Sequence, residues 1–172
     1  VLIKSMLSDQ LDFIGIAKEV FTVGDLREIR RRTIGRGKIG GKAAGLLLAR
    51  KILEMADEGE EYGSDLAQHV DIPDSYFIGA DVFYDFQTIN NFTHYMNQKY
   101  RSSEEITADH PRLRKDYLTG EFPAEIRYSL QQLLQKLGKT PIIVRSSSLL
   151  EVHFGAALAG KYKSVFCPNQ GT

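Results

Sequence analysis

The sequence predicts a mixed fold of the α/β or α+β class, with helices packed on a small sheet. Several stretches place apolar residues three or four positions apart, as the buried faces of helices do. Two short β-branched or aromatic runs, at residues 75–80 and 141–145, lie between the helical stretches and are typical of strands. The chain has 172 residues, 42% of them hydrophobic, and is therefore long enough to bury a core.

Three helices are expected in the N-terminal third of the chain. The first covers residues 11–20, where apolar residues recur at helical spacing. The second begins at a cap, either Thr22 or Asp25, and continues into an arginine-rich stretch. The third covers residues 42–55, and its N-terminus follows the glycine-rich segment 35–41.

The middle of the chain alternates between polar and apolar segments. Residues 58–63 are rich in glutamate and indicate an acidic surface loop. Residues 75–80 predict a short buried strand, and residues 80–100 predict one or two aromatic-rich helices.

The C-terminal third contains a helix with clear signals at both ends. Pro123 stands at a helix-starting position, and Gly138 follows the last apolar residue as a C-cap would. The β-branched run 141–145 then predicts a strand, and residues 157–166 predict a second strand that is interrupted at Gly160.

The charge balance hides a strong local asymmetry. The chain carries 22 basic and 22 acidic residues, which weakly disfavours a general nucleic-acid-binding protein. Residues 27–51 hold nine basic residues and one acidic residue, a net charge of +8. Residues 54–85 hold ten acidic residues and no basic residue, a net charge of −10. Either the two stretches form faces that attract each other or another chain, or the basic stretch contains an anion site.

Cysteine and hydropathy indicate the compartment. Cys167 is the single cysteine, so an internal disulfide is excluded and a reducing environment such as the cytoplasm is expected. No apolar run reaches the roughly 18 residues of a membrane span. The four histidines show no metal-ligand spacing, so no metal site is expected. The chain lacks an initiator methionine and ends after a strand-like run, and we expect it to be part of a longer polypeptide.

The glycine-rich segment fits none of the familiar nucleotide-binding loops in full. Gly35, Gly37 and Gly40 have the spacing of a dinucleotide-binding loop, but such a loop follows a strand and none is expected here. A P-loop would need glycine in place of Arg36 and a hydroxyl residue in place of Ala43. A protein-kinase loop joins two strands, whereas this segment opens a helix.

The glycine-rich segment nevertheless has the general features of a phosphate-binding site. Flexible glycines expose backbone N–H groups, the helix N-terminus adds partial positive charge, and Lys42 adds a full charge. The alternative is a loop that merely opens a helix and carries a solvated lysine.

A second candidate site follows the strand at residues 141–145. Arg145 ends that strand, and its planar guanidinium suits bidentate binding of phosphate or carboxylate. The alternative is a structural ion pair, for example with Glu151. The three serines at 146–148 lack the flanking glycines of a hydrolase nucleophile, so a hydrolase is not expected.

Four segments, in order, resemble motifs of the phosphoenolpyruvate synthase and pyruvate phosphate dikinase family. They are residues 40–46 (GGKAAGL), 72–78 (IPDSYFI), 143–151 (IVRSSSLLE) and 158–165 (LAGKYKSV). The sequence departs from the family pattern at Val152, Leu158 and residues 161–162, which indicates a divergent branch.

The resemblance implies the N-terminal lobe of an ATP-grasp-like nucleotide-binding domain at residues 35–172, preceded by a helical extension at residues 1–34. In relatives the lysine of the first motif and the arginine of the third contact the nucleotide phosphates, and the loop of the fourth motif also lies at the nucleotide. Carried over to this chain, the implied nucleotide-binding residues are Lys42, Arg145, Gly40, Gly41, Gly160 and Ser164.

The resemblance further implies a function for a longer protein. This portion would bind ATP, while the Mg²⁺ ligands and the histidine that carries the phosphoryl group would lie outside the chain. No catalytic residue is expected here, and the chain alone should be inactive. Its expected partners are the nucleotide, further domains of the polypeptide and a small-molecule phosphoryl acceptor, with neither membrane nor nucleic acid. The alternative is a non-catalytic regulatory or interaction module derived from that family.

Overall fold

The computed structural model describes residues 1–57, 69–148, 152–153, 156–157 and 162–170. The N-terminal elements are α1 (Leu2–Met6), α2 (Leu11–Val20), α3 (Val23–Arg31), β1 (Thr33–Ile34) and α4 (Gly41–Asp57). Then follow β2 (Phe77–Ile78), α5 (Asp81–Ile89), the 3₁₀ segment η2 (Thr93–Tyr100), α6 (Ser103–Thr119) and α7 (Ala124–Leu137). The last elements are β3 (Ile142–Arg145), β4 (Val152–His153), β5 (Ala156–Ala157) and β6 (Ser164–Cys167).

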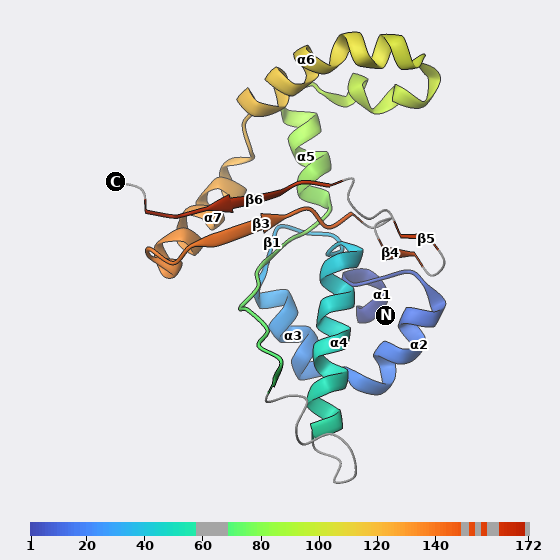
Figure 1. Cartoon of the computed structure of the whole chain (residues 1–172), viewed down its shortest axis with the longest axis vertical. Helices are drawn as coiled ribbons and strands as arrows, with labels where there is room; N and C mark the ends of the chain where they lie inside the picture. The colour runs from blue at the N-terminus through green and yellow to red at the C-terminus, as the bar shows by residue number, and fades with distance from the viewer. Residues whose placement is uncertain (58–68, 149–151, 154–155, 158–161, 171–172) are drawn as a thin grey trace.

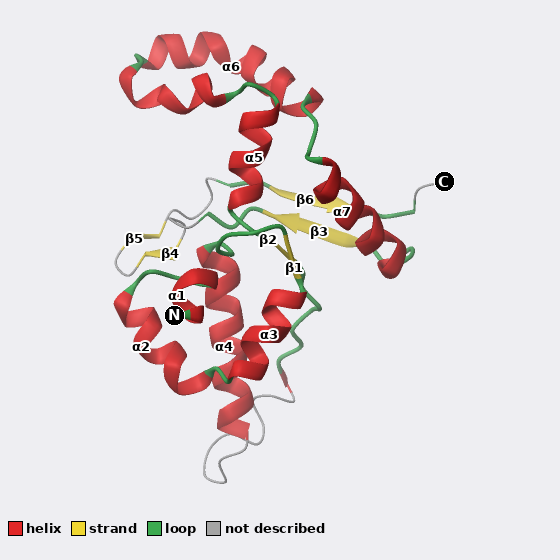
Figure 2. Ribbon diagram, turned by 180° about the vertical axis from the view of Figure 1, so that it is seen from behind, coloured by secondary structure: helices red, strands yellow, loops and turns green. Residues whose placement is uncertain are grey.

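The molecule has a helical body at one end and a helical arm at the other. Figure 1 shows α1 to α4 packed together as the body, with α5 leading away from it to η2 and α6. The ribbon formed by β3 and β6 lies between these two parts, and α7 lies alongside the ribbon in both Figure 1 and Figure 2. None of the described helices is both long and apolar enough to cross a membrane.

The described strands form three two-stranded sheets. Strands β1 and β2 are parallel, whereas β3 pairs with β6 and β4 pairs with β5 in antiparallel fashion. This combination of helices with small parallel and antiparallel sheets confirms the predicted mixed class.

The core of the body is a cluster of buried apolar side chains contributed by α2, α3, α4, β2 and the adjoining loops. Its members are Leu7, Phe13, Ala17, Leu26, Ile29, Ile39, Ala44 and Phe77. These residues come from both sides of position 34, so the N-terminal helices pack as one unit with α4. The domain boundary at 34/35 itself stays a prediction.

An aromatic cluster joins the arm to α5. The Phe86 ring centroid lies 5.0 Å from that of Phe122, and Phe92 stacks on Tyr117 with centroids 5.4 Å apart. A Cβ atom on Gly120 would lie 2.6 Å from the Phe86 ring, so glycine permits this close packing. Helix α6 has no buried residue, so the aromatic contacts of Tyr117 are an important part of its attachment.

Most of the predicted elements are confirmed. The helices expected at residues 11–20, 42–55 and after Pro123 correspond to α2, α4 and α7, and the arginine-rich helix corresponds to α3. Both candidate caps of α3 take part, because Thr22 and Asp25 form a reciprocal capping box. Gly138 follows α7 with a positive φ of 60°, as expected of a glycine C-cap.

Other expectations need correction or lie outside the described residues. The strand expected at residues 75–80 is shorter, since β2 covers Phe77–Ile78, and the helical stretch at 80–100 is divided into α5 and η2. Strand β6 confirms the end of the strand expected at 157–166, but Gly160 and the acidic loop 58–63 lie outside the described residues. Helices α1 and α6 and strands β1 and β4 have no counterpart among the predicted elements.

Candidate functional site

Helix α4 begins in close contact with the segment that follows β3. Gly40 is buried, and its carbonyl accepts a hydrogen bond from the Ala44 N–H at 3.0 Å, so Gly40 occupies the N-cap position. A Cβ atom on Gly40 would lie 1.3 Å from the carbonyl oxygen of Ser147. The backbone of Ser147 therefore fills the space that an N-cap side chain would need, and glycine is required at position 40.

Ser147 supplies the missing cap from elsewhere in the chain. Its hydroxyl oxygen accepts a hydrogen bond from the Ala43 N–H at 3.0 Å, although the two residues are 104 positions apart. The carbonyl of Ser148 accepts a hydrogen bond from the Gly41 N–H, also at 3.0 Å. The expectation of free N–H groups at this helix N-terminus is therefore wrong for Gly41 and Ala43.

The first part of the glycine-rich segment packs against the start of α5. Gly35 and Gly37 have positive φ values of 75° and 85°, which favour glycine. A Cβ atom on Gly37 would lie 2.4 Å from the Asp81 carboxylate, and the Asp81 N–H donates to the Arg36 carbonyl at 3.2 Å. Gly35 and Gly37 therefore belong to a tight turn packed against α5, whereas the sequence predicts a flexible segment.

A strand does precede this segment, contrary to expectation. Strand β1 ends at Ile34, immediately before Gly35, and it pairs with β2. At two residues β1 is too short to give a strong hydropathy signal. Among the described residues β1 and β2 form a sheet of their own, which is unlike the extended parallel sheet of a dinucleotide-binding fold.

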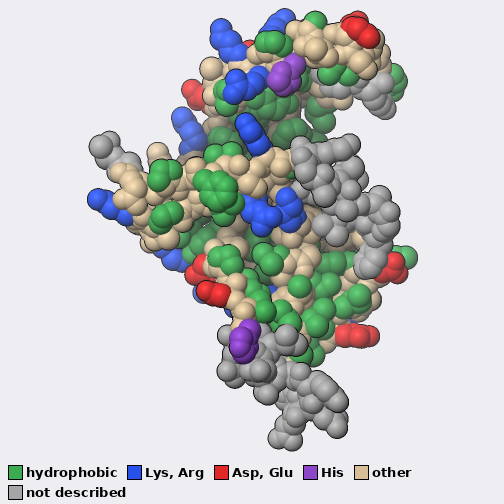
Figure 3. Space-filling model, in the orientation of Figure 1, with side chains coloured by type: hydrophobic (Ala, Val, Ile, Leu, Met, Phe, Trp, Pro, Cys, Tyr) green, Lys and Arg blue, Asp and Glu red, His purple; other side chains and the backbone are tan. Residues whose placement is uncertain are grey.

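The end of the β3–β6 ribbon brings two further predicted residues together. Arg145 lies directly opposite Ser164 in the antiparallel register, so both side chains leave the same face of the ribbon. Both residues are exposed. Figure 3 shows Lys and Arg side chains near the middle of the molecule, over this ribbon.

Five of the six predicted nucleotide-binding residues thus belong to one region. Lys42 is half-buried and lies between Gly41 and Ala43, whose N–H groups bond to the serines two and three residues beyond Arg145. Ser164 faces Arg145 across the ribbon. Gly160 lies outside the described residues, as does Glu151, the alternative partner of Arg145.

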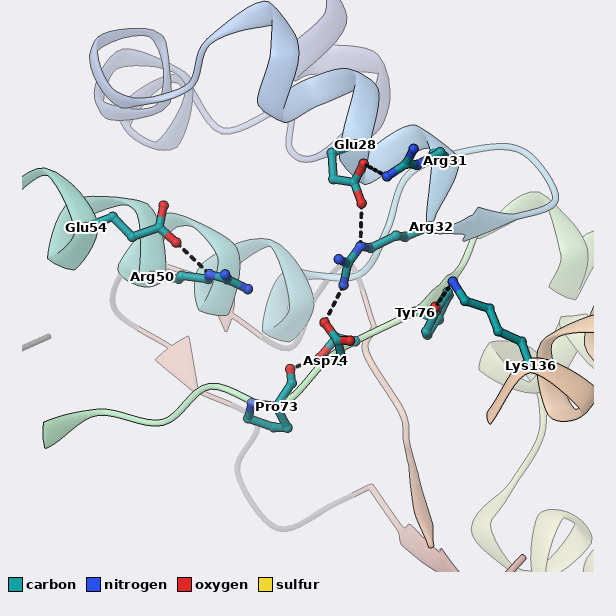
Figure 4. A network of polar contacts seen from close by, with 10 residues as sticks. Glu28, Arg31, Arg32, Arg50, Glu54, Pro73, Asp74, Tyr76 and Lys136 are labelled. Carbon is teal, nitrogen blue, oxygen red and sulfur yellow. Dashed lines mark hydrogen bonds and ion pairs between the residues drawn. The ribbon is translucent and has the colours of Figure 1, made fainter. Parts of the chain in front are cut away.

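A separate cavity of about 230 Å³ lies between α3, α4 and residues 72–77. Arg32 at its wall contacts Glu28 and Asp74, each at 2.7 Å, and Figure 4 shows these ion pairs together with that of Arg50 and Glu54. The hydrogen bond to Glu28, with a further one to Asp74, raises the pKa of Arg32 above its usual value.

The contact between Arg32 and Asp74 links the basic stretch to the acidic one, as one of the two interpretations of the charge pattern requires.

A second cavity of about 560 Å³ lies beside Lys38 and Tyr84. Neither cavity is lined by Lys42 or Arg145, so neither of them is the predicted nucleotide site.

The residues of this region lie inside a match to a known protein family. Residues 36–172 match the family described as "Pyruvate phosphate dikinase, AMP/ATP-binding domain". The chain belongs to this family. The match confirms the resemblance noted from the four sequence motifs, and it includes all six predicted nucleotide-binding residues. Searches of the curated proteins and of the solved structures give no significant match.

Membership of this family makes a nucleotide the expected ligand, and the residues present suit its phosphates. The AMP/ATP-binding domain offers two cationic side chains, Lys42 and Arg145, on two elements that hydrogen bonds hold together. Across the described ranges, no group of three or more His, Cys, Asp or Glu side chains is arranged to hold a metal ion. The two cationic side chains have the charge that binding of phosphate requires.

Proposed function

We propose that this chain binds the phosphates of ATP or AMP between Lys42 on α4 and Arg145 at the end of β3, with Gly40, Gly41, Gly160 and Ser164 beside them. The observation that carries the proposal is the junction of α4 with the serine segment after β3, inside the matched nucleotide-binding domain. It supports the proposal because it joins the backbones of the two cation-bearing elements.

The two cations would act in different ways. The Arg145 guanidinium presents a planar fork of donors that suits two phosphate oxygens at once, whereas the Lys42 ammonium is a compact point charge. Together they would neutralise phosphate charge from two sides. Mg²⁺ would accompany the nucleotide and neutralise part of its phosphate charge, and its protein ligands would lie outside this chain.

The corresponding activity belongs to a longer protein. We infer an ATP-dependent phosphotransferase similar to phosphoenolpyruvate synthase or pyruvate phosphate dikinase, in which residues 35–172 form the ATP-grasp-like lobe and residues 1–34 a helical extension. Phosphoryl transfer would pass through a histidine outside this chain to a small-molecule acceptor. We therefore propose that the chain alone binds nucleotide without turnover, and that it acts in the cytoplasm.

A Mg²⁺-ATP titration followed by NMR chemical shifts tests the site. Shifts should saturate and cluster at residues 40–42, Arg145 and Ser164. Lys42→Ala and Arg145→Ala should each raise the Kd about tenfold, because each removes a charge-assisted contact.

Exposed cations on α6 provide matched controls, namely Lys115→Ala for the lysine and Arg114→Ala for the arginine. These two variants should leave the Kd unchanged. Equal affinity of wild type, Lys42→Ala and Arg145→Ala would overturn the site, and so would an absence of saturable shifts at millimolar ATP.

A further inference from the structure

Ser147 has a structural role that the family resemblance does not assign. Its hydroxyl takes the place of an N-cap side chain on α4, and its carbonyl oxygen occupies the space next to Gly40. The neighbouring Ser148 carbonyl makes the second hydrogen bond, to the Gly41 N–H. Lys42 is the residue between the two N–H groups that are bound in this way.

This arrangement has two alternative consequences for nucleotide affinity, one of which lowers the affinity and the other raises it. If a phosphate must bind the N–H groups at the start of α4, then Ser147 and Ser148 compete with the nucleotide for them. If the serine contacts persist in the bound state, they instead fix Lys42 relative to Arg145. The close fit at Gly40 favours the second case, since a phosphate that displaced the serines would have to break a tightly packed backbone contact at a buried residue.

We propose that Ser147 is a positioning residue for nucleotide binding, which holds Lys42 and Arg145 at the separation that the phosphates require. This inference rests on the proposed function. Ser147 acts through the backbone of α4 and does not itself touch the nucleotide. The phosphates are then held by the two cationic side chains and not by the Gly41 and Ala43 N–H groups at the helix N-terminus.

The test compares ATP affinity in Ser147→Ala and in Ser102→Ala, measured on the full chain by calorimetry. Ser102 is a matched control because it also caps a helix through its hydroxyl, which accepts from the Glu105 N–H at 3.2 Å on α6. We expect Ser147→Ala to raise the Kd on the order of fivefold. Ser102→Ala should leave the Kd unchanged.

A double-mutant cycle separates positioning from a general loss of stability. If Ser147 acts by placing Lys42, its substitution should have no further effect on ATP affinity in a Lys42→Ala background. The Ala43 amide resonance should shift in Ser147→Ala, because its hydrogen bond is lost. Ser147→Thr keeps the hydroxyl. In this variant both the chemical shift of the Ala43 amide and the ATP affinity should equal those of wild type.

Each alternative has its own signature. Tighter ATP binding by Ser147→Ala would show that the serine competes with phosphate, and would overturn the positioning role. Effects that are additive with Lys42→Ala, or equal to those of Ser102→Ala, would also overturn it. If Lys42→Ala and Arg145→Ala both leave the affinity unchanged, the proposed nucleotide site fails instead.

Discussion

The N-termini of α3 and α4 carry the same hydrogen bond, made in two different ways. On α3 the Thr22 hydroxyl accepts from the Asp25 N–H at 3.2 Å, three residues along the chain. On α4 the Ser147 hydroxyl accepts from the Ala43 N–H at 3.0 Å, from 104 residues away. The first cap belongs to one helix, whereas the second joins a helix to a strand end and exists only in the folded chain.

The difference between the two caps shows how a helix start becomes part of a site. The hydroxyl of a local cap stabilises its own helix. The distant cap on α4 brings Lys42 into the same region as Arg145, at the cost of requiring glycine at position 40. Changes at α4 should therefore affect both stability and ligand affinity, and changes at α3 stability alone.

The largest expected effect comes from Gly40→Ala. The added Cβ atom would meet the Ser147 carbonyl oxygen at 1.3 Å, so the strand end must move away from α4. We expect a loss of about 3 kcal/mol in the free energy of unfolding, together with loss of ATP binding. Urea denaturation and an ATP titration measure the two effects.

Gly45→Ala provides a control on the same helix. A Cβ atom at Gly45 would have no neighbour within 4 Å, so alanine should stabilise the helix by about 0.8 kcal/mol. If Gly40→Ala is as stable as wild type, the close contact between Gly40 and Ser147 does not exist.

A smaller effect is expected at the local cap. Thr22→Ala removes the hydroxyl that caps α3 and should lower the free energy of unfolding by about 1 kcal/mol. ATP affinity should not change, because none of the predicted nucleotide-binding residues lies on α3. Thr22→Ser keeps the hydroxyl and should restore most of the stability in the same denaturation experiment. If Thr22→Ala loses ATP affinity, the cap of α3 does not differ from that of α4 in its effect on the nucleotide site.

This contrast also explains which parts of the fold could be predicted. The cap of α3 and the ends of α7 depend on neighbouring residues, so Thr22, Asp25, Pro123 and Gly138 indicate them directly. The charges of Lys42 and Arg145 are likewise evident from the sequence. Helical periodicity predicts the position of Lys42 at a helix start, and the β-branched run before Arg145 predicts its position at a strand end. The contact that joins them depends on Ser147, and no signal near Gly40 announces a partner 104 residues away.

The missed elements lacked a periodic apolar pattern for physical reasons. Helix α6 buries none of its residues and contains Pro111, so it has no apolar stripe and carries a residue that disfavours helices. Its start was nevertheless marked, since Ser102 and Glu105 have the spacing of a capping box and form one in the structure. Strand β1 has two residues and shows no alternation that a sequence could reveal.

The smallest expected effect is on the pH dependence of stability. It distinguishes the two caps because only the cap of α3 contains a titrating group. Burial tends to raise the pKa of Asp25, but hydrogen bonds from Thr22 and the contact with Lys51 outweigh it and lower that pKa below 3.8. The contribution of Asp25 to stability is therefore complete above its ordinary pKa of 3.8 and is lost as the pH falls through the lowered value. At the α4 cap, a serine hydroxyl and a carbonyl do not titrate.

Urea unfolding of Asp25→Asn and Ser147→Ala at pH 6.5 and pH 2.5 measures this difference. Asp25→Asn should lower the free energy of unfolding by less than about 1 kcal/mol at pH 6.5, since the ion pair with Lys51 is partly exposed. At pH 2.5 the deficit of Asp25→Asn relative to wild type should shrink, because the wild-type carboxylate is becoming protonated. The deficit of Ser147→Ala should be equal at both pH values. The stability loss caused by Ser147→Ala could instead change with pH in the same way as that caused by Asp25→Asn. This result would mean that a titrating group, and not the neutral cap, stabilises the start of α4.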